Sequence, residues 1–299
     1  MSNQAELTLL SREGIRTRRS LQRRLWRLAR GKPLGTISLL VILSLVAMAL
    51  FAEQIAPHDP LTLYRGHELS PPTSRFPMGN DQFGRDVMSR VIHGSRTSLL
   101  VGVSAVGLGL IFGVSIGMVS AYVAGRFDLL VQRVMDSIDA FPGIILALAI
   151  IAALSPSLLN VIIAIGVTDI PRNNRVVRGS VLSEKNNVYV EAAKAIGNSE
   201  FRIMWRHIFP NVTAPTIIIA ATQLGSAILA EASLSFLGVG VPPPNPSWGT
   251  MLAGDNRIFM IGSPHLAIFP GLAISFAVLG WNLLGDALRD VWDPRLRGR

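Results

Sequence analysis

The stretch that decides the fold is residues 98–124, which read SLLVGVSAVGLGLIFGVSIGMVSAYVA. It holds 27 residues and no charged side chain. A helix needs about 20 mostly apolar residues to cross the hydrocarbon core of a bilayer. This stretch is therefore predicted to be a membrane-spanning helix that is long enough to tilt.

Small residues recur along this stretch at every fourth position. That spacing places them on one face of a helix. In lipid, where no hydrophobic force drives helices together, such a face lets two helix backbones approach closely. The pattern predicts a tight packing face at Ala105, Gly109, Gly113, Gly117, Ala121 and Gly125.

Further apolar stretches lie on both sides of this one. Segments three and four are separated by little more than Ser155-Pro156-Ser157, which predicts a tight hairpin. The expected fold is therefore all-α, with six transmembrane helices. The six stretches are 34–52, 98–124, 129–154, 158–168, 212–241 and 265–288.

The positive charges choose an orientation for these spans. With the N-terminus in the cytoplasm, 22 of the 28 Lys and Arg residues fall on the cytoplasmic side. Loops rich in Lys and Arg stay in the cytoplasm, so both termini are predicted to be cytoplasmic. The formal net charge of +9 is then explained by topology and needs no nucleic-acid partner.

Composition supports a membrane protein. Hydrophobic residues make up 49% of the chain and charged residues 16%, against about 25% charged in a globular protein. There is no cysteine, which excludes disulfides, thiolate metal sites and cysteine nucleophiles.

The N-terminal region allows two interpretations. Ala47-Met48-Ala49 fits the small-residue cleavage pattern of a signal peptide. However, the preceding region of 33 residues and the long apolar run exceed what a signal peptide carries. We therefore expect a retained first helix, with the Arg-rich residues 12–32 facing membrane lipid.

Recognisable catalytic motifs are missing from the chain. There is no Gly-x-x-x-x-Gly-Lys-Ser/Thr loop for ATP, no His-Glu-x-x-His metal motif and no Gly-x-Ser-x-Gly elbow. The sequence therefore indicates a protein that is not an enzyme, with no cofactor or metal of its own.

Polar residues inside predicted spans are candidates for a transport route. Asp169, Arg172 and Asn173 stand at i, i+3 and i+4 beside Pro171 and are expected to share a helix face. They either line a pathway or form an ion pair near the cytoplasmic interface. Glu231 stands alone late in the fifth span.

The longest cytoplasmic loop, 184–211, contains two short predicted helices. Gly197 is expected to end the first, Asn198 or Ser199 to cap the second, and Pro210 to close the second. The second helix would place large apolar residues on one face and is either a docking element or a helix lying on lipid. These apolar residues are Phe201, Met204, Trp205 and Ile208.

Four motifs in this order resemble the permease subunits of ABC importers, in the branch that carries peptides and nickel. The loop 191–211, EAAKAIGNSEFRIMWRHIFPN, is similar to their cytoplasmic coupling motif, with His207 and Phe209 where Ile and Leu are common. Residues 78–90, MGNDQFGRDVMSR, resemble a signature before the second span, with Asn80 for the usual Thr. The others are SLSFLG at 233–238 with Trp248-Gly249, and FPG at 269–271 with NLLGD at 282–286.

The resemblance is to the C-type permease of dipeptide, oligopeptide and glutathione importers, and it implies a type I importer fold. The implied partners are a second, homologous permease, two ATPase subunits that carry ATP and Mg²⁺, and an extracytoplasmic solute-binding protein. It also implies that ATP drives alternating access through this loop. Phe201, Met204 and Trp205 would dock on an ATPase, and Glu191, Ala192 and Gly197 would shape the loop. Pro210 belongs to the same coupling motif.

The resemblance also sets the expected location, which is the bacterial inner membrane, and leaves the cargo open. Peptides are the first expectation; nickel chelates, glutathione and opines are alternatives, and a stand-alone secondary transporter is the second reading. In this family, apolar residues usually stand where Asp169 and Asn173 lie, which favours a polar route here. The expected parts are a basic segment 1–33, a first helix 34–56, an extracytoplasmic loop 57–97, a five-helix core 98–290 and a tail 291–299.

Overall fold

The computed structural model describes residues 33–254 and 256–292. Within these residues every regular element is helical, and the only strand-like pairing is a single bridge between Asn80 and Asp86. The basic N-terminal segment and most of the predicted C-terminal tail lie outside the described residues. The elements are α3 (Pro33–Leu50), α4 (Ala52–Ile55), α5 (Val87–Val123), α6 (Gly125–Asp139), α7 (Gly143–Leu154), α8 (Leu158–Glu184), α9 (Val188–Ala195), α10 (Glu200–Arg202), the π-helix η1 (Ile203–Ile208), α11 (Phe209–Phe236), α12 (Trp248–Met251), α13 (Asn256–Phe259) and α14 (His265–Trp292).

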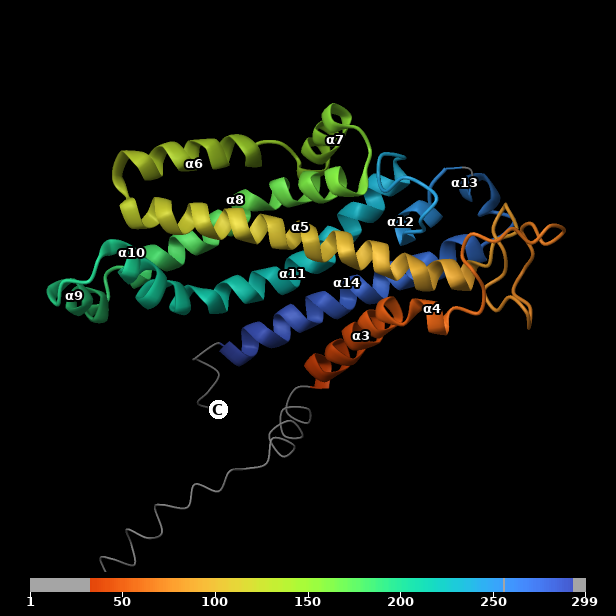
Figure 1. Ribbon diagram of the computed structural model, residues 1–299, viewed down its shortest axis with the longest axis horizontal. Coiled ribbons are helices and arrows are strands. Elements are labelled where there is room, and N and C mark those ends of the chain that lie inside the picture. Colours follow the sequence, from red (N-terminus) through yellow and green to blue (C-terminus); the bar gives the residue numbers. More distant parts are fainter. Residues whose placement is uncertain (1–32, 255, 293–299) are drawn as a thin grey trace, which may run out of the picture.

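Long helices lying side by side form the body of the molecule (Figure 1). The closest packing is between α5 and α8, and α11 packs on α5, α8 and α14. Helix α3 covers α14 and part of α5. At one end of the bundle lie α9 and α10, and at the other lie α12, α13 and the loop that precedes α5 (Figure 1).

Four helices are long and apolar enough to cross a membrane, or five if the bent pair α6 and α7 counts as one span. Helix α8 is not among them, because its second half is polar. Many large apolar side chains on these helices face outward, such as Leu40 on α3 and Ile111 on α5. Outward apolar surface of this kind suits lipid or a partner subunit.

The predicted third span is not one straight helix. Helices α6 and α7 are bent by 88° at the break between Asp139 and Gly143. Pro142 has no backbone N–H and disfavours helical geometry at Phe141, which explains the break. The following hairpin is as predicted: Ser155 adopts a φ of 70°, and Ser157 accepts a hydrogen bond from the Asn160 backbone N–H.

The second span begins earlier than the sequence predicted, at Val87 instead of Ser98. Asp86 caps this helix by accepting hydrogen bonds from the backbone N–H groups of Met88 and Ser89, at 3.3 and 3.1 Å. A capping aspartate satisfies N–H groups that have no partner inside the helix. The extra turns carry the helix out of its apolar stretch and into the loop that precedes it.

The predicted small-residue face packs on α8. A Cβ added to Gly113 would lie 2.5 Å from the Cβ of Asn173, and one added to Gly117 would lie 2.6 Å from the Asn174 carbonyl oxygen. Glycine is therefore required at these positions by close contact of the two helices. Gly125 is an exception, because it starts α6 with a φ of 64° and nothing lies near it.

The loop of residues 56–86 is packed against the ends of α5 and α14. Phe76 is fully buried among the rings of His58, Tyr64 and His67. Gly84 has a φ of 76°, and a Cβ there would lie 2.4 Å from the Tyr64 carbonyl oxygen. The 78–90 signature is thus a compact turn whose glycine is needed for space and backbone conformation.

Candidate functional site

The segment between α8 and α11 folds as the predicted pair of helices with a turn. Gly197 has a φ of 82° and donates its backbone N–H to the Lys194 carbonyl, which ends α9. Ser199 then caps α10 by accepting from the Arg202 backbone N–H at 3.4 Å. Glu191, Ala192 and Gly197 are all exposed at this end of the bundle.

The apolar residues of the second helix do not share one face. Met204 is buried with Ile203 and Ile208 in a cluster that also holds side chains of α5, α8 and α9. Phe201 is 71% exposed and Trp205 is 38% exposed. Because η1 is a π-helix, its side chains turn by a smaller angle per residue than an α-helical projection assumes.

An outer row of aromatic rings results from this geometry. The ring centroids of Phe201 and Trp205 lie 6.2 Å apart, and those of Trp205 and Phe209 lie 5.2 Å apart. Val188 and Ile196 of the same loop are each 80% exposed. The i, i+4, i+8 spacing of the aromatic residues is the signal in the sequence that would have revealed this row.

The prediction that Pro210 closes the second helix is wrong. Pro210 lies in the first turn of α11, and the helix continues without a break from Glu200 to Phe236. Proline lacks the N–H that would bond to the carbonyl four residues earlier. The Phe209 N–H bonds to the Met204 carbonyl, five residues back, so the π-helical turn accommodates the proline.

Hydrogen bonds fasten this loop to the helical bundle. The Tyr122 hydroxyl at the end of α5 donates to the Glu200 carboxylate, and the Lys185 ammonium donates to the Tyr122 carbonyl at 2.6 Å. The Tyr189 hydroxyl donates to the Glu184 carboxylate at 2.6 Å. Burial and this bond to Glu184 raise the pKa of Tyr189. These bonds tie the loop to the ends of α5 and α8.

The polar residues of α8 are divided between two environments. Asn173 is fully buried against Gly109 and Gly113, and neither atom of its amide has a hydrogen-bond partner. Arg172 is exposed, and no ion pair joins it to Asp169 among the described residues. A Cβ added to Gly109 would lie 3.0 Å from the Asp169 Cβ and 3.3 Å from the Asn173 Nδ2, so Asp169 and Asn173 share the face of α8 that packs on α5. The predicted common face is therefore seen for these two residues, whereas Arg172 lies outside it.

Asp169 lines a cavity of about 160 Å³ between α7, α8 and α11. Its neighbours there include Thr168 and Ser226, and the remaining wall is mostly apolar. One carboxylate in such a cavity can hold a cationic or hydrogen-bond-donating group. Of the four residues predicted to line a route, Asp169 is the one that faces this cavity.

Glu231 lies inside the protein. It is fully buried, and its carboxylate accepts hydrogen bonds from the hydroxyls of Ser98, Ser235 and Ser247 at 3.1, 2.8 and 2.8 Å. Ser98 also accepts the backbone N–H of Trp248. Glu231 thus joins α5, α11 and the start of α12, which is a role that its position in the sequence did not reveal.

Comparison with known families gives two matches. Residues 109–298 match the family described as the binding-protein-dependent transport system inner membrane component. Residues 20–72 match the N-terminal transmembrane domain of oligopeptide transport permease C. Together the two matches cover the first predicted span, part of the loop that follows it, and the bundle from the second half of α5 onward.

Three similar permease proteins match this chain along most of its length. The di/tripeptide transport system permease protein DppC of Pseudomonas aeruginosa is 43% identical over 265 residues, covering 87% of each chain. The glutathione transport system permease protein GsiD of Escherichia coli is 40% identical over 274 residues, covering 91% of this chain and 90% of that one. The dipeptide permease DppC of Alkalihalophilus pseudofirmus is 40% identical over 264 residues, covering 88% and 86%.

A solved structure shares the fold. The crystal structure of an amino acid ABC transporter with histidines superposes with a TM-score of 0.50, covering 69% of this chain and 94% of that one. The sequences are 16% identical, so this likeness concerns the fold alone.

Proposed function

This chain belongs to the family of binding-protein-dependent transport system inner membrane components, and on that premise we propose that it forms half of the membrane pathway of an ATP-driven peptide importer. It is a transport subunit and not an enzyme. A second, homologous permease completes the pathway, and the two open alternately to each side of the bacterial inner membrane.

The proposed topology has six spans with both termini in the cytoplasm. The four long apolar helices and the bent pair α6 and α7 supply five of these spans. The sixth is α8, whose polar half is screened from lipid by packing on α5 and α6. The concentration of Lys and Arg near the termini and in the loop 185–211 supports this orientation.

The coupling proposal rests on the exposed aromatic row of the loop. Phe201 and Trp205 present apolar surface that a partner would cover, and the loop is bonded to α5 and α8. We assign this surface to docking on one of two ATPase subunits, which carry ATP and Mg²⁺. Met204 contributes by holding the helix in place from inside. Glu191, Ala192 and Gly197 shape the turn on which the docking surface stands.

Mechanically, closure of the ATPases moves this loop, and its bonds carry the movement into the bundle. The loop is bonded near the end of each of these two helices, so its movement shifts the close contact between α5 and α8. We propose that Asp169 faces the cargo route, that Asn173 meets it when the α5–α8 contact changes, and that Arg172 lies at its edge. Glu231 is assigned to holding α5 and α11 together instead of lining the route.

The cargo class follows from the similar proteins, which are named for transport of dipeptides, di/tripeptides and glutathione. We propose a small peptide, delivered by an extracytoplasmic solute-binding protein. Nickel chelates, glutathione and opines are the alternatives within the same importer class.

The test is co-purification of the tagged chain in mild detergent, with intact-mass analysis of its partners. One second permease and two ATPase copies per chain are expected. A chain that purifies alone as a stable, monodisperse species contradicts the proposal and favours a stand-alone secondary transporter.

A further inference from the structure

A cavity lies at the end of the bundle opposite the loop of residues 184–211. Its volume is about 560 Å³, which is in the range of small-molecule sites. Three parts of the chain that are far apart in sequence form its wall: the 78–90 signature, the hairpin at Pro156, and the segment between α11 and α12. In the proposed topology all three lie on the extracytoplasmic side.

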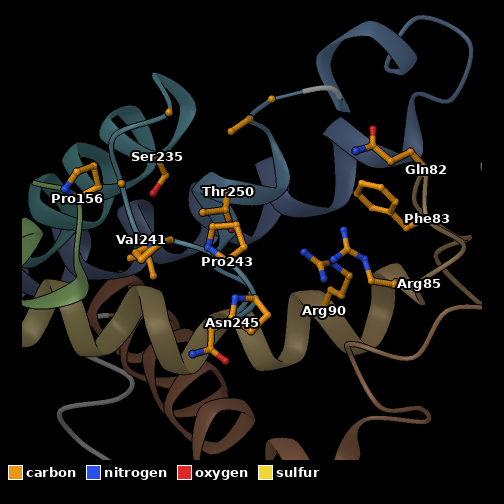
Figure 2. Close-up of a pocket in the computed structure, with 16 residues that line it drawn as sticks. Gln82, Phe83, Arg85, Arg90, Pro156, Ser235, Val241, Pro243, Asn245 and Thr250 are labelled. Atoms are coloured by element: carbon orange, nitrogen blue, oxygen red, sulfur yellow. The ribbon is translucent and has the colours of Figure 1, made fainter.

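Two arginines of the signature supply the charge of this cavity. Arg85 and Arg90 both line it, and their guanidinium groups lie next to each other at its edge (Figure 2). Arg90 is 6% exposed, so its charge is almost entirely removed from bulk water. The two residues come from the turn before α5 and from the first turns of α5, which hold them rigidly.

One carboxylate is shared between these two cations. Asp81 Oδ2 lies 2.7 Å from Arg85 Nε and 3.5 Å from Arg90 Nε. The other oxygen, Oδ1, accepts the backbone N–H groups of Phe83 and Arg85 at 2.9 and 3.0 Å. Two positive charges therefore meet one negative charge, and one positive charge is left in excess.

The terminal nitrogens of Arg85 are available to a ligand. Among the described residues, its only side-chain hydrogen bond is the one from Nε to Asp81. The bond to Asp81 orients the guanidinium group, which also lies 4.7 Å from the centroid of the Phe83 ring. A fixed, planar guanidinium with free terminal N–H groups is suited to bind a carboxylate through two parallel hydrogen bonds.

The rest of the wall favours an anionic group with an apolar body. Val241 and the prolines at 242–244 contribute apolar surface, and Asn245 adds a polar side chain (Figure 2). Apolar walls strengthen the attraction between an arginine and an anion by lowering the local dielectric constant.

We propose that this cavity is a binding site for the carboxylate end of a small solute, which is held by Arg85 and Arg90. The solute identity, a short peptide, rests on the proposed function. Every unmodified peptide has a terminal carboxylate, so the site accepts cargo with different side chains by a group common to all of them.

The test compares two probes that differ only in this group, dialanine and alanyl-alaninamide. Their binding is measured by isothermal titration calorimetry on the full-length chain in mild detergent, together with any subunits that accompany it. The wild-type protein is expected to bind dialanine about ten- to a hundred-fold more tightly, as a charged hydrogen-bonded pair implies. Arg85→Gln removes this preference, and Arg85→Lys, which keeps the charge but not the planar fork, reduces it.

The matched control is Arg65→Gln, because Arg65 is an exposed arginine in the same loop and does not line the cavity. It should keep the full preference for dialanine. Thermal unfolding without ligand establishes that each variant is folded. If Arg85→Gln is not folded, the preference of Arg85→Lys for dialanine tests the proposal instead.

Equal binding of the two probes to the wild-type protein, or an unchanged preference in the Arg85 variants, overturns the proposal. Loss of peptide uptake in Arg85→Gln without any preference in the binding assay also overturns it, because Arg85 would then contact the binding protein. The outcome is independent of the importer assignment: a chain that purifies without ATPases can still distinguish the two probes.

Discussion

Replacing Gly113 by alanine tests the close contact between α5 and α8. The added Cβ would lie 2.5 Å from the Asn173 Cβ and 2.9 Å from the Ile170 carbonyl oxygen. Carbon atoms in contact prefer a separation of about 3.5–4.0 Å, so the two helices must move apart by roughly 1 Å. The second obstacle is backbone, which cannot turn away as a flexible side chain can. Overpacking of this kind costs about 1–3 kcal/mol.

The matched control is Gly107→Ala in the same helix, where nothing lies within 4 Å of the added Cβ. Both substitutions gain the same helix propensity, about 1 kcal/mol, so the difference between the variants isolates the contact. Thermal unfolding in detergent should give Gly113→Ala a Tm roughly 3–9 °C below that of Gly107→Ala. Equal Tm values for the two variants would refute the close packing of α5 on α8.

Three further predictions concern the buried carboxylate, the cargo route and the topology. Glu231→Ala removes the acceptor of three serine hydroxyls and should lower the unfolding free energy by about 3–5 kcal/mol. Glu231→Gln should lower the unfolding free energy less. Equal Tm values for both variants and the wild type would contradict this prediction. Asp169→Leu combined with Asn173→Leu should alter peptide uptake kinetics in membrane vesicles without loss of subunit assembly, and unchanged kinetics would exclude the proposed route. Because the chain has no cysteine, Ile196→Cys and Ile261→Cys each give a protein with one reactive thiol. A membrane-impermeant maleimide should label the Ile261 variant from outside intact cells and the Ile196 variant only after the cells are opened. Labelling of both variants from outside would contradict the topology.

Features set by local chemistry were predictable from the sequence. Apolar runs located the long helices, and the four-residue spacing of Gly109, Gly113 and Gly117 identified the face of α5 that packs on α8. The turn at Gly197 followed from the preference of glycine for a positive φ after a helix. These features depend on a few neighbouring residues, so a single stretch of sequence contains the whole signal.

Features set by contacts between distant segments were not predictable. The hydrogen bond between Ser98 and Glu231 joins residues that are 133 positions apart, so no local pattern in the sequence predicts it. The sequence predicts an ordinary α-helix after Ser199, whereas the π-helical turn η1 before Pro210 places Met204 inside and Trp205 outside. The cavity lined by Arg85 and Arg90 is formed by three segments that are far apart in the sequence, so no local sequence pattern predicts it.

The family resemblance predicted more about function than the residue patterns did alone. It indicated the subunit type and the branch, which the similar permease proteins bear out. Helix α8 shows what the apolar run did not predict: the run ends at Thr168, but the helix continues through Pro171 to Glu184 as it packs on α5.

The most direct test of the account is whether the exposed aromatic row contacts an ATPase. A single cysteine at Phe201→Cys, in a chain that has no other cysteine, is treated with a short thiol-reactive cross-linker that also bonds to lysine, in membranes that contain the whole transporter. Ile261→Cys, which is 94% exposed at the opposite end of the bundle, serves as the matched control. The account predicts a cross-linked product of the Phe201 variant with an ATPase subunit and none for the Ile261 variant. No product with an ATPase from the Phe201 variant, or an equal yield from both variants, would contradict the claim that this loop couples ATP hydrolysis to transport.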